Sequence, residues 1–168
     1  TTMLRYLALL YARDLASGGV VVADKLKLNE SGYLPILLPL RQIGSFLREH
    51  PSRENDTFGH KLLLEFLFTS LGNERIKLPA DFFDAYLNSG KAIILLDGLD
   101  EVADEDLRRQ VSRLVEAFTD AYPSCRFVVT SRIKSYTGAA RLGGDYATTT
   151  VRDFVLADVE NFLSTWHR

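Results

Sequence analysis

The pattern of apolar and polar residues along the chain predicts strands that alternate with helices. Three mainly apolar runs are typical of strands buried on both faces of a sheet: residues 33–40 (YLPILLPL), 92–97 (AIILLD) and 125–131 (CRFVVTS). Pro35 and Pro39 favour an edge position for the first of these strands, because proline cannot donate a ladder hydrogen bond. A weaker strand is expected over residues 148–156.

Apolar residues spaced three and four positions apart predict amphipathic helices in most of the remaining chain. These helices are expected over residues 1–16, 41–50, 57–71, 79–90, 104–122 and 157–168. Residues 20–32 are interpreted as a polar-edged connection. Strands that alternate with helices predict a three-layer α/β domain with a mainly parallel sheet.

The composition is that of one globular domain with a hydrophobic core: 168 residues, of which 46% are hydrophobic and 25% charged. The formal net charge of -2 shows no basic excess, so we expect neither DNA nor RNA as a ligand. No apolar stretch approaches the roughly 20 residues that span a bilayer, and the N-terminus lacks the order of a signal peptide. We therefore expect a cytoplasmic protein without a membrane span.

The cysteine and the histidines suggest neither a disulfide nor a zinc site. Cys125 is the single cysteine and lies in a predicted strand, where we expect it to act as a small buried hydrophobe. His50, His60 and His167 lack the spacing of metal ligands.

Carboxylates follow the predicted strand over residues 92–97. Asp97 ends this strand, and Asp100 and Glu101 come directly after Gly98 and Leu99. Ligands of parallel sheets bind beyond the carboxyl ends of the strands. Asp97 could hold the hydration shell of Mg²⁺ there, while Asp100 or Glu101 could orient or deprotonate a water that attacks a γ-phosphate. Of the two, we favour Glu101 for the water.

The alternative for these carboxylates is a purely structural role at the start of the next helix. Acidic side chains are favoured in the first turn of a helix because they complement its positive end. We expect this role for Asp104, Glu105 and Asp106.

Hydroxyls and a guanidinium follow the next predicted strand, which ends on Thr130, Ser131 and Arg132. On a neighbouring strand they would lie beside the same phosphate site, where Arg132 could detect a γ-phosphate by charge-assisted hydrogen bonds. Taken alone, a terminal Ser-Arg is usually a surface turn.

The segments IILLDGLDE, FVVTSR and YLPILLPLR together resemble the NACHT family of signal-transduction NTPases, in the STAND branch of P-loop ATPases. By this resemblance, residues 91–101 are similar to the Walker B segment and residues 125–132 to sensor 1. Residues 156–168 are similar to the start of the helical region that follows such domains. The resemblance implies a P-loop NTPase-like fold over residues 1–168.

One motif of the family is absent, because the chain contains no G-x-x-x-x-G-K-[ST] phosphate loop. In the family this loop runs directly into a helix that resembles residues 1–16. The predicted first helix also lacks a start signal, so we expect the sequence to have been cut from a longer protein just before it. The resemblance then implies Thr1 as a Mg²⁺ ligand and Thr1 and Thr2 beside the nucleotide.

The missing segment has a structural consequence, because the family's strand before the phosphate loop is central in the sheet. We therefore expect a domain that lacks its first, central strand. Strands ending near Leu40, Asp97 and Thr130 should pair as one sheet, whereas residues 148–155 should have no regular partner.

The resemblance implies a nucleotide-dependent switch for defence or stress signalling, which binds ATP or GTP with Mg²⁺ and hydrolyses it slowly. Its expected partners are the nucleotide, neighbouring NTPase domains in self-association, and other domains of the same chain; the fragment alone should be inactive. The alternative is a non-catalytic assembly module with a degenerate nucleotide site. A receiver-like protein fits less well, because its late strand would end in lysine rather than Arg132.

Overall fold

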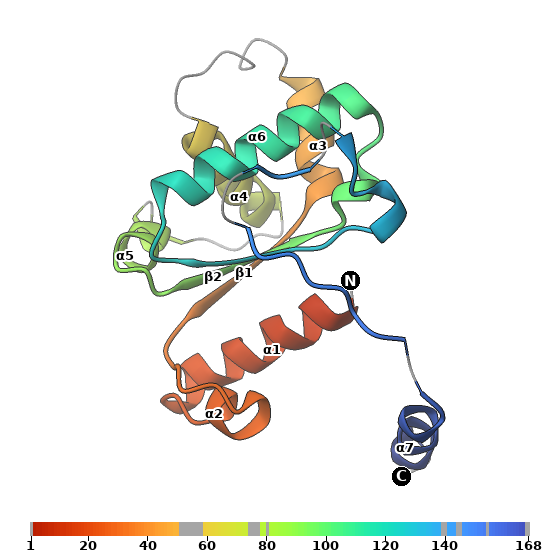
Figure 1. Cartoon of the computed structure of the whole chain (residues 1–168). Helices are drawn as coiled ribbons and strands as arrows, with labels where there is room; N and C mark the ends of the chain where they lie inside the picture. The colour runs from red at the N-terminus through yellow and green to blue at the C-terminus, as the bar shows by residue number, and fades with distance from the viewer. Residues whose placement is uncertain are drawn as a thin grey trace.

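The sheet at the centre of the molecule has three parallel strands in the order β1-β2-β3 (Figure 1). The computed structural model describes residues 2–50, 59–73, 78–79, 81–138, 141–143, 146–153 and 155–166. The strands are β1 (Leu34–Pro39), β2 (Ala92–Asp97) and β3 (Arg126–Val129). All three main strands predicted from the apolar runs are confirmed, and β1 takes the edge position that its prolines favour.

Helices occupy the segments where helical spacing predicts them. They are α1 (Thr2–Ser17), α3 (Leu40–Glu49), α4 (Gly59–Asn73), α5 (Phe82–Asn88), α6 (Glu105–Ala121) and α7 (Leu156–Trp166). Two short 3-10 turns, η2 (Leu99–Glu101) and η3 (Ile133–Ser135), follow the second and third strands.

The interpretation of residues 20–32 as a connection is wrong in part, because they contain helix α2 (Val21–Leu26). Val22 is buried against the sheet, and its N–H donates to the carboxylate of Asp14 in α1 at 3.0 Å. A partner eight residues earlier in the chain therefore supports the first turn of a helix that has no cap of its own.

The weak strand predicted over residues 148–156 is also wrong. Residues 146–153 and 155 belong to no helix or strand, and Leu156 is the first residue of α7; residue 154 lies outside the described residues. The expectation that this segment has no regular partner is confirmed for residues 148–153 and 155. The sheet formed by the described residues ends at β3.

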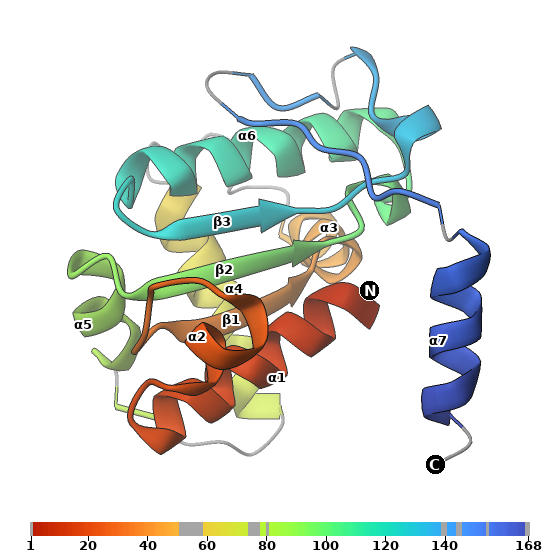
Figure 2. The ribbon, with the colours of Figure 1, turned by 60° about the horizontal axis from the view of Figure 1, so that its bottom comes forward.

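Helices cover both faces of the sheet, which gives the three layers predicted (Figures 1 and 2). Ile93 and Leu95 of β2 point to one face and pack with Leu4 and Tyr11 of α1. The alternate residues of β2 point to the other face and join a larger core with α3, α4, α5 and α6. Successive side chains of β2 thus point to opposite faces of the sheet and belong to two separate hydrophobic cores.

The carboxyl ends of the strands lie at one edge of the molecule. Figure 2 shows that α1 begins at this same edge, beside the arrowheads of β1 and β2. The strand-end residues and the start of α1 are therefore neighbours in the fold, although about 90 residues separate Thr2 from β2 in the sequence.

Helix α7 stands beside the rest of the molecule rather than on the sheet (Figure 2). Leu156 and Leu163 of this helix are largely open to solvent, with 74% and 48% of their surface exposed. Among the described residues, no helix has the length and apolar character needed to cross a membrane.

Candidate functional site

The candidate site is built on the turn that follows β2. Asp97 ends this strand, and Gly98 then takes a left-handed conformation with φ of +76°. A Cβ on residue 98 would lie 3.0 Å from the side-chain carboxyl carbon of Glu101. The positive φ favours glycine here, because residues with a side chain rarely adopt it.

The end of β3 is tied to this turn through Thr130. The Thr130 hydroxyl donates to Oδ1 of Asp97 at 3.0 Å and accepts the N–H of Gly98 at 3.0 Å. Backbone bonds reinforce the connection, since the N–H of Thr130 donates to the Leu96 carbonyl and the N–H of Leu99 donates to the Thr130 carbonyl, each at 2.9 Å. The Asp97 carboxylate is therefore held in a fixed direction, partly buried, at the carboxyl edge of the sheet.

Asp100 binds Arg132 from the segment after β3. Its Oδ1 accepts the backbone N–H of Arg132 at 3.0 Å, and its Oδ2 pairs with Nε of the same residue at 3.2 Å. The Asp100 side chain is 10% exposed, whereas that of Arg132 is 81% exposed. Asp100 is thus the buried anchor of the pair, and Arg132 extends from it into solvent.

Arg108 of α6 supports the same turn from the inside. Its Nη2 donates to the Val102 carbonyl at 3.1 Å and, more weakly, to the Asp100 carbonyl at 3.5 Å. The Arg108 Nε is buried without a hydrogen-bond partner among the described residues. Sequence reasoning missed this residue, because an arginine on an amphipathic helix gives no sign of which carbonyls it will reach.

The residues predicted from the two strand ends come together at one edge. Asp97 is hydrogen-bonded to Thr130, and Asp100 is paired with Arg132, two residues after Thr130. Glu101 is exposed on the same turn as Asp100. The Ser131 hydroxyl donates to the neighbouring Arg132 carbonyl at 3.4 Å.

The remaining predicted site residues are Thr1 and Thr2, next to or within the start of the sequence of α1. Thr2 is exposed in the first turn of this helix, at the same edge of the molecule as the strand ends. Thr1, predicted as a Mg²⁺ ligand, lies outside the described residues. Within those residues, no group of three or more histidine, cysteine or acidic side chains is close enough to hold a metal ion.

The prediction that Asp104 serves the start of the following helix is confirmed. Asp104 is the N-cap of α6, where its Oδ1 accepts the N–H of Leu107 at 2.8 Å. Its Oδ2 pairs with Nη2 of Arg48 at 3.0 Å. Glu105 and Asp106 lie in the first turn of α6, in ion pairs with Arg109.

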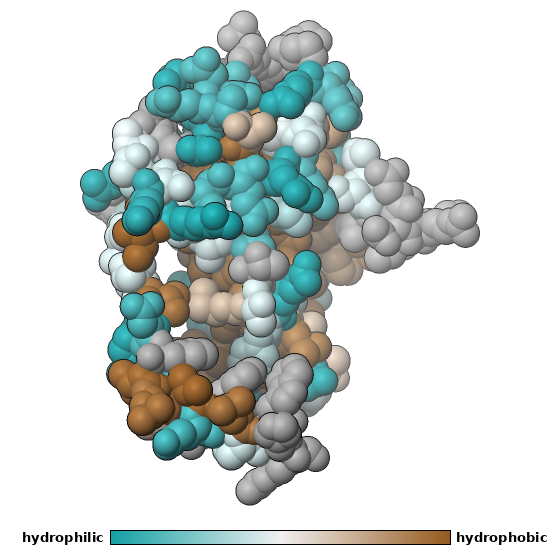
Figure 3. Space-filling model, turned by 90° about the vertical axis from the view of Figure 1, so that its right-hand side faces the viewer, coloured by the Kyte–Doolittle hydropathy of each residue, from teal (hydrophilic) through white to brown (hydrophobic). Residues whose placement is uncertain are grey.

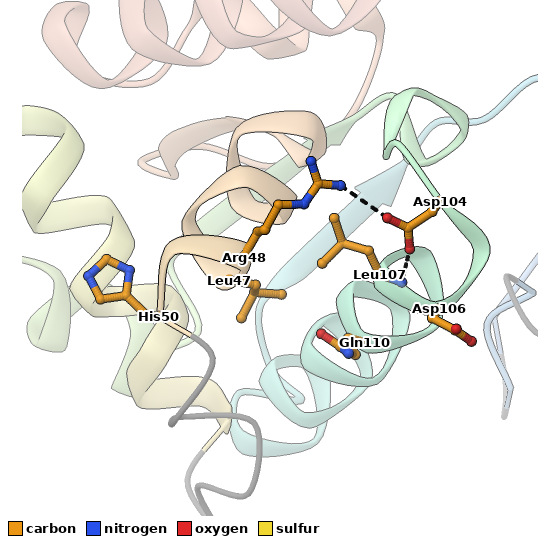
Figure 4. Close-up of a pocket in the computed structure, with 7 residues that line it drawn as sticks. All are labelled: Leu47, Arg48, His50, Asp104, Asp106, Leu107 and Gln110. Atoms are coloured by element: carbon orange, nitrogen blue, oxygen red, sulfur yellow. Dashed lines mark hydrogen bonds and ion pairs between the residues drawn. The ribbon is translucent and has the colours of Figure 1, made fainter.

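A shallow pocket of about 240 Å³ lies elsewhere, between the end of α3 and the first turns of α6 (Figure 4). Its lining residues are Leu47, Arg48, His50, Asp104, Asp106, Leu107 and Gln110. The ion pair between Arg48 and Asp104 lies at its wall, and none of the predicted site residues lines it. The candidate residues at the carboxyl ends of the strands therefore lie outside this pocket.

Cys125 has the structural role expected of it. It is buried directly before β3, and its thiol donates to the Leu87 carbonyl at 3.4 Å. Burial raises the pKa of the Cys125 thiol. A buried, protonated thiol is a poor nucleophile and a poor metal ligand.

In comparisons with known proteins, no protein-family model, curated protein or solved structure matches the chain. The residues at the strand ends therefore define what this edge can do. A fixed carboxylate, a second carboxylate paired with an exposed arginine, and an exposed glutamate form a set suited to a hard cation and a phosphate group.

Proposed function

We propose that the protein containing this chain is a nucleotide-dependent switch of the NACHT type, with a P-loop NTPase-like fold. The main support is the edge of the sheet where Thr130 bonds Asp97 at 3.0 Å and Arg132 is held beside it. A carboxylate at the end of one strand and an arginine after the next are two of the groups by which such a fold binds a Mg²⁺-nucleotide; the phosphate loop supplies the others. The proposed setting is cytoplasmic defence or stress signalling.

The residues at this edge suit Mg²⁺ better than a softer metal. Asp97 offers a partly buried carboxylate whose direction is fixed by Thr130, and Thr2 at the start of α1 offers a hydroxyl at the same edge. Mg²⁺ favours oxygen ligands and usually keeps several waters, so one or two protein groups are enough. When bound with ATP or GTP, Mg²⁺ would neutralise charge on the phosphate oxygens; Asp97 and Thr1 would hold it, and Thr1 and Thr2 would lie beside the nucleotide.

The other residues divide the remaining work. Arg132 is exposed after β3 and would detect the terminal phosphate. Glu101 is exposed on the turn and would orient the attacking water, as would Asp100 in the alternative assignment. Ser131 lies beside Arg132 and contributes to the same end of the nucleotide site.

The open edge of β3 supports a P-loop fold with a further strand. Among the described residues, β3 pairs only with β2, and its side chains are only partly buried, unlike those of β2. An unpaired edge with apolar side chains is a poor surface to leave in water. We propose that a strand and a phosphate loop that precede Thr1 in a longer protein occupy this edge.

A second function, a non-catalytic assembly module, is favoured by apolar surface on α7. Figure 3 shows apolar atoms gathered at the lower left of the molecule, where α7 lies. They belong to Leu156, Val159 and Leu163, at helical spacing. Surfaces of this kind contact other domains or other copies of a protein, which is what an assembly module requires.

The decisive experiment measures Mg²⁺-dependent binding and hydrolysis of ATP and GTP by a form of the protein extended about 40 residues upstream, enough for a strand and a phosphate loop. Asp97→Ala should weaken binding, and Glu101→Gln should lower turnover with binding retained. Asp106→Asn, an exposed acid in the first turn of α6, is the control and should change neither. Absence of nucleotide binding by the extended protein would leave the assembly module as the function.

A further inference from the structure

Asp100 and Glu101 are adjacent carboxylates with opposite surroundings. The Asp100 side chain is 10% exposed and both of its oxygens accept from Arg132, whereas Glu101 is exposed on the outside of the turn. A carboxylate whose oxygens already accept charge-assisted hydrogen bonds has little capacity left for a proton from water. The two residues are therefore unsuited to the same task.

The Arg132 guanidinium is held through its Nε by Asp100. Its Nε faces Oδ2 of Asp100 at 3.2 Å, and its two terminal Nη nitrogens make no hydrogen bond or ion pair among the described residues. Arginine has a rigid fork of donors, so a bond to Nε fixes the direction in which the Nη groups point. Asp100 thus restrains the plane of the guanidinium and leaves the terminal N–H donors available to another group.

Asp100 is itself fixed on both sides. Its backbone belongs to η2, where the neighbouring Leu99 N–H donates to the Thr130 carbonyl at 2.9 Å. From α6, Arg108 reaches the carbonyls of Asp100 and Val102. An anchor of this kind can hold a flexible side chain without being rearranged by it.

We propose that Asp100 is a positioning residue for Arg132, which keeps the Nη groups ready for the terminal phosphate of a nucleoside triphosphate, and that it does not act on the attacking water. This inference rests on the proposed nucleotide-binding function and assigns the discrimination between triphosphate and diphosphate to the Asp100–Arg132 pair. Glu101 is left as the residue that orients the water.

The test compares the affinities for ADP and for a non-hydrolysable ATP analogue in the upstream-extended protein, by calorimetry. Asp100→Asn and Arg132→Lys should each reduce the preference for the ATP analogue by about tenfold, the effect of one charge-assisted hydrogen bond. The double variant should lose no more than the single ones, because both act through the same guanidinium. Glu101→Gln should keep the preference and lose turnover.

The matched control is another aspartate-arginine pair, Asp104 with Arg48, which lies at the pocket between α3 and α6. Asp104→Asn should leave the nucleotide preference unchanged, since asparagine is also a good N-cap. If Asp100→Asn is unfolded by circular dichroism, Asp100→Glu replaces it, because it keeps the charge and displaces the carboxylate by one methylene.

The outcomes separate the two proposals. Wild-type protein that binds neither nucleotide overturns the proposed function and this inference with it. Wild-type protein that binds, with an unchanged preference in the Asp100 variant and a reduced turnover, overturns the inference alone and makes Asp100 the residue that acts on water.

Discussion

At the scale of single residues, the Thr130 hydroxyl connects two strands through their side chains. It accepts from the N–H of Gly98 and donates to Asp97, so a chain of two hydrogen bonds runs across the carboxyl edge of the sheet. Hydrogen bonds in such chains strengthen one another, and the final acceptor is charged. The orientation of Asp97 therefore depends on a residue 33 positions later in the sequence.

Thr130→Val tests this connection with little change of shape. The substitution removes the hydroxyl that accepts the Gly98 N–H and donates to Asp97, so we expect a loss of about 1–3 kcal/mol in the free energy of unfolding. Urea denaturation followed by circular dichroism measures it. Thr130→Ser keeps the hydroxyl and should lose distinctly less; a Thr130→Val variant as stable as the wild type, with a loss in Thr130→Ser, would show that the methyl group matters and the hydrogen bonds do not.

Asp14 of α1 also connects segments that are distant in the sequence through side-chain hydrogen bonds. This fully buried carboxylate accepts the N–H of Val22 at 3.0 Å and that of Gly32 at 3.2 Å. It thereby fixes both ends of the segment between α1 and β1, which includes α2. A buried aspartate on the apolar face of a helix is costly unless it is satisfied in this way.

Asp14→Ala should lower the free energy of unfolding by about 2–4 kcal/mol, because two buried N–H groups lose a charged acceptor. Asp14→Asn, with one carbonyl oxygen, can satisfy only one of them and should fall between alanine and the wild type. Thermal unfolding gives the order of the three proteins. Asp24→Ala is the control, because among the described residues this exposed acid pairs with its exposed neighbour Lys25. This substitution should lower the free energy of unfolding by about 0.3 kcal/mol.

At the scale of elements, the turn and helix after β2 are each specified by local residues. Gly98 permits the left-handed turn, and Asp104 caps α6 six residues later. These are signals that a sequence carries openly, and they explain why the predicted helix over residues 104–122 agrees closely with α6.

Asp104→Ala should cost about 1 kcal/mol in the free energy of unfolding, the usual contribution of an N-cap. Its ion pair with Arg48 adds little, because both side chains are more than half exposed. Asp106→Ala, in the first turn of the same helix, removes charge but no cap and should cost about 0.3 kcal/mol. Guanidinium denaturation of both variants compares the cap with simple charge at a helix start.

At the scale of the whole molecule, several weakly acidic groups are held neutral in the two cores. Burial raises the pKa of the Tyr11, Tyr122 and Tyr146 phenols and of the Cys125 thiol. Tyr11 also donates its hydroxyl to Glu30, whose negative charge adds to the effect. In the unfolded chain these groups ionise near their ordinary values, 10.0 for tyrosine and 9.0 for cysteine.

The stability of the protein should therefore fall at alkaline pH. Below about pH 8 all four groups are protonated in both states and stability is unaffected by them. Above that pH the unfolded chain releases protons that the folded protein retains, so the urea midpoint should decrease steadily between about pH 9 and 11. Tyr122→Phe removes one phenol and should show a smaller decrease; a midpoint that rises with pH would contradict the burial argument.

Much of the fold was predictable, because strands buried on both faces require long apolar runs. YLPILLPL, AIILLD and CRFVVTS were identified as strands on this ground, and the carboxylates and hydroxyls at their ends were expected at one edge of the sheet. The strand predicted over residues 148–156 was wrong, because β-branched residues favour a strand only where a neighbouring strand is present to pair with them. Helix α2 was missed, because its support comes from Asp14 in another helix.

The sequence by itself determined the three strands, the main helices and the edge where the candidate residues gather, since these follow from periodicity, glycine and capping signals that act within a few residues. Only the tertiary structure decided which partner each polar group takes: Thr130 for Asp97, Arg132 for Asp100, and the backbone N–H groups of Val22 and Gly32 for Asp14. The physical reason is that hydrogen bonds depend on ångström-scale positions set by strand register and loop path, whereas hydrophobic burial depends mainly on the order of residues along the chain.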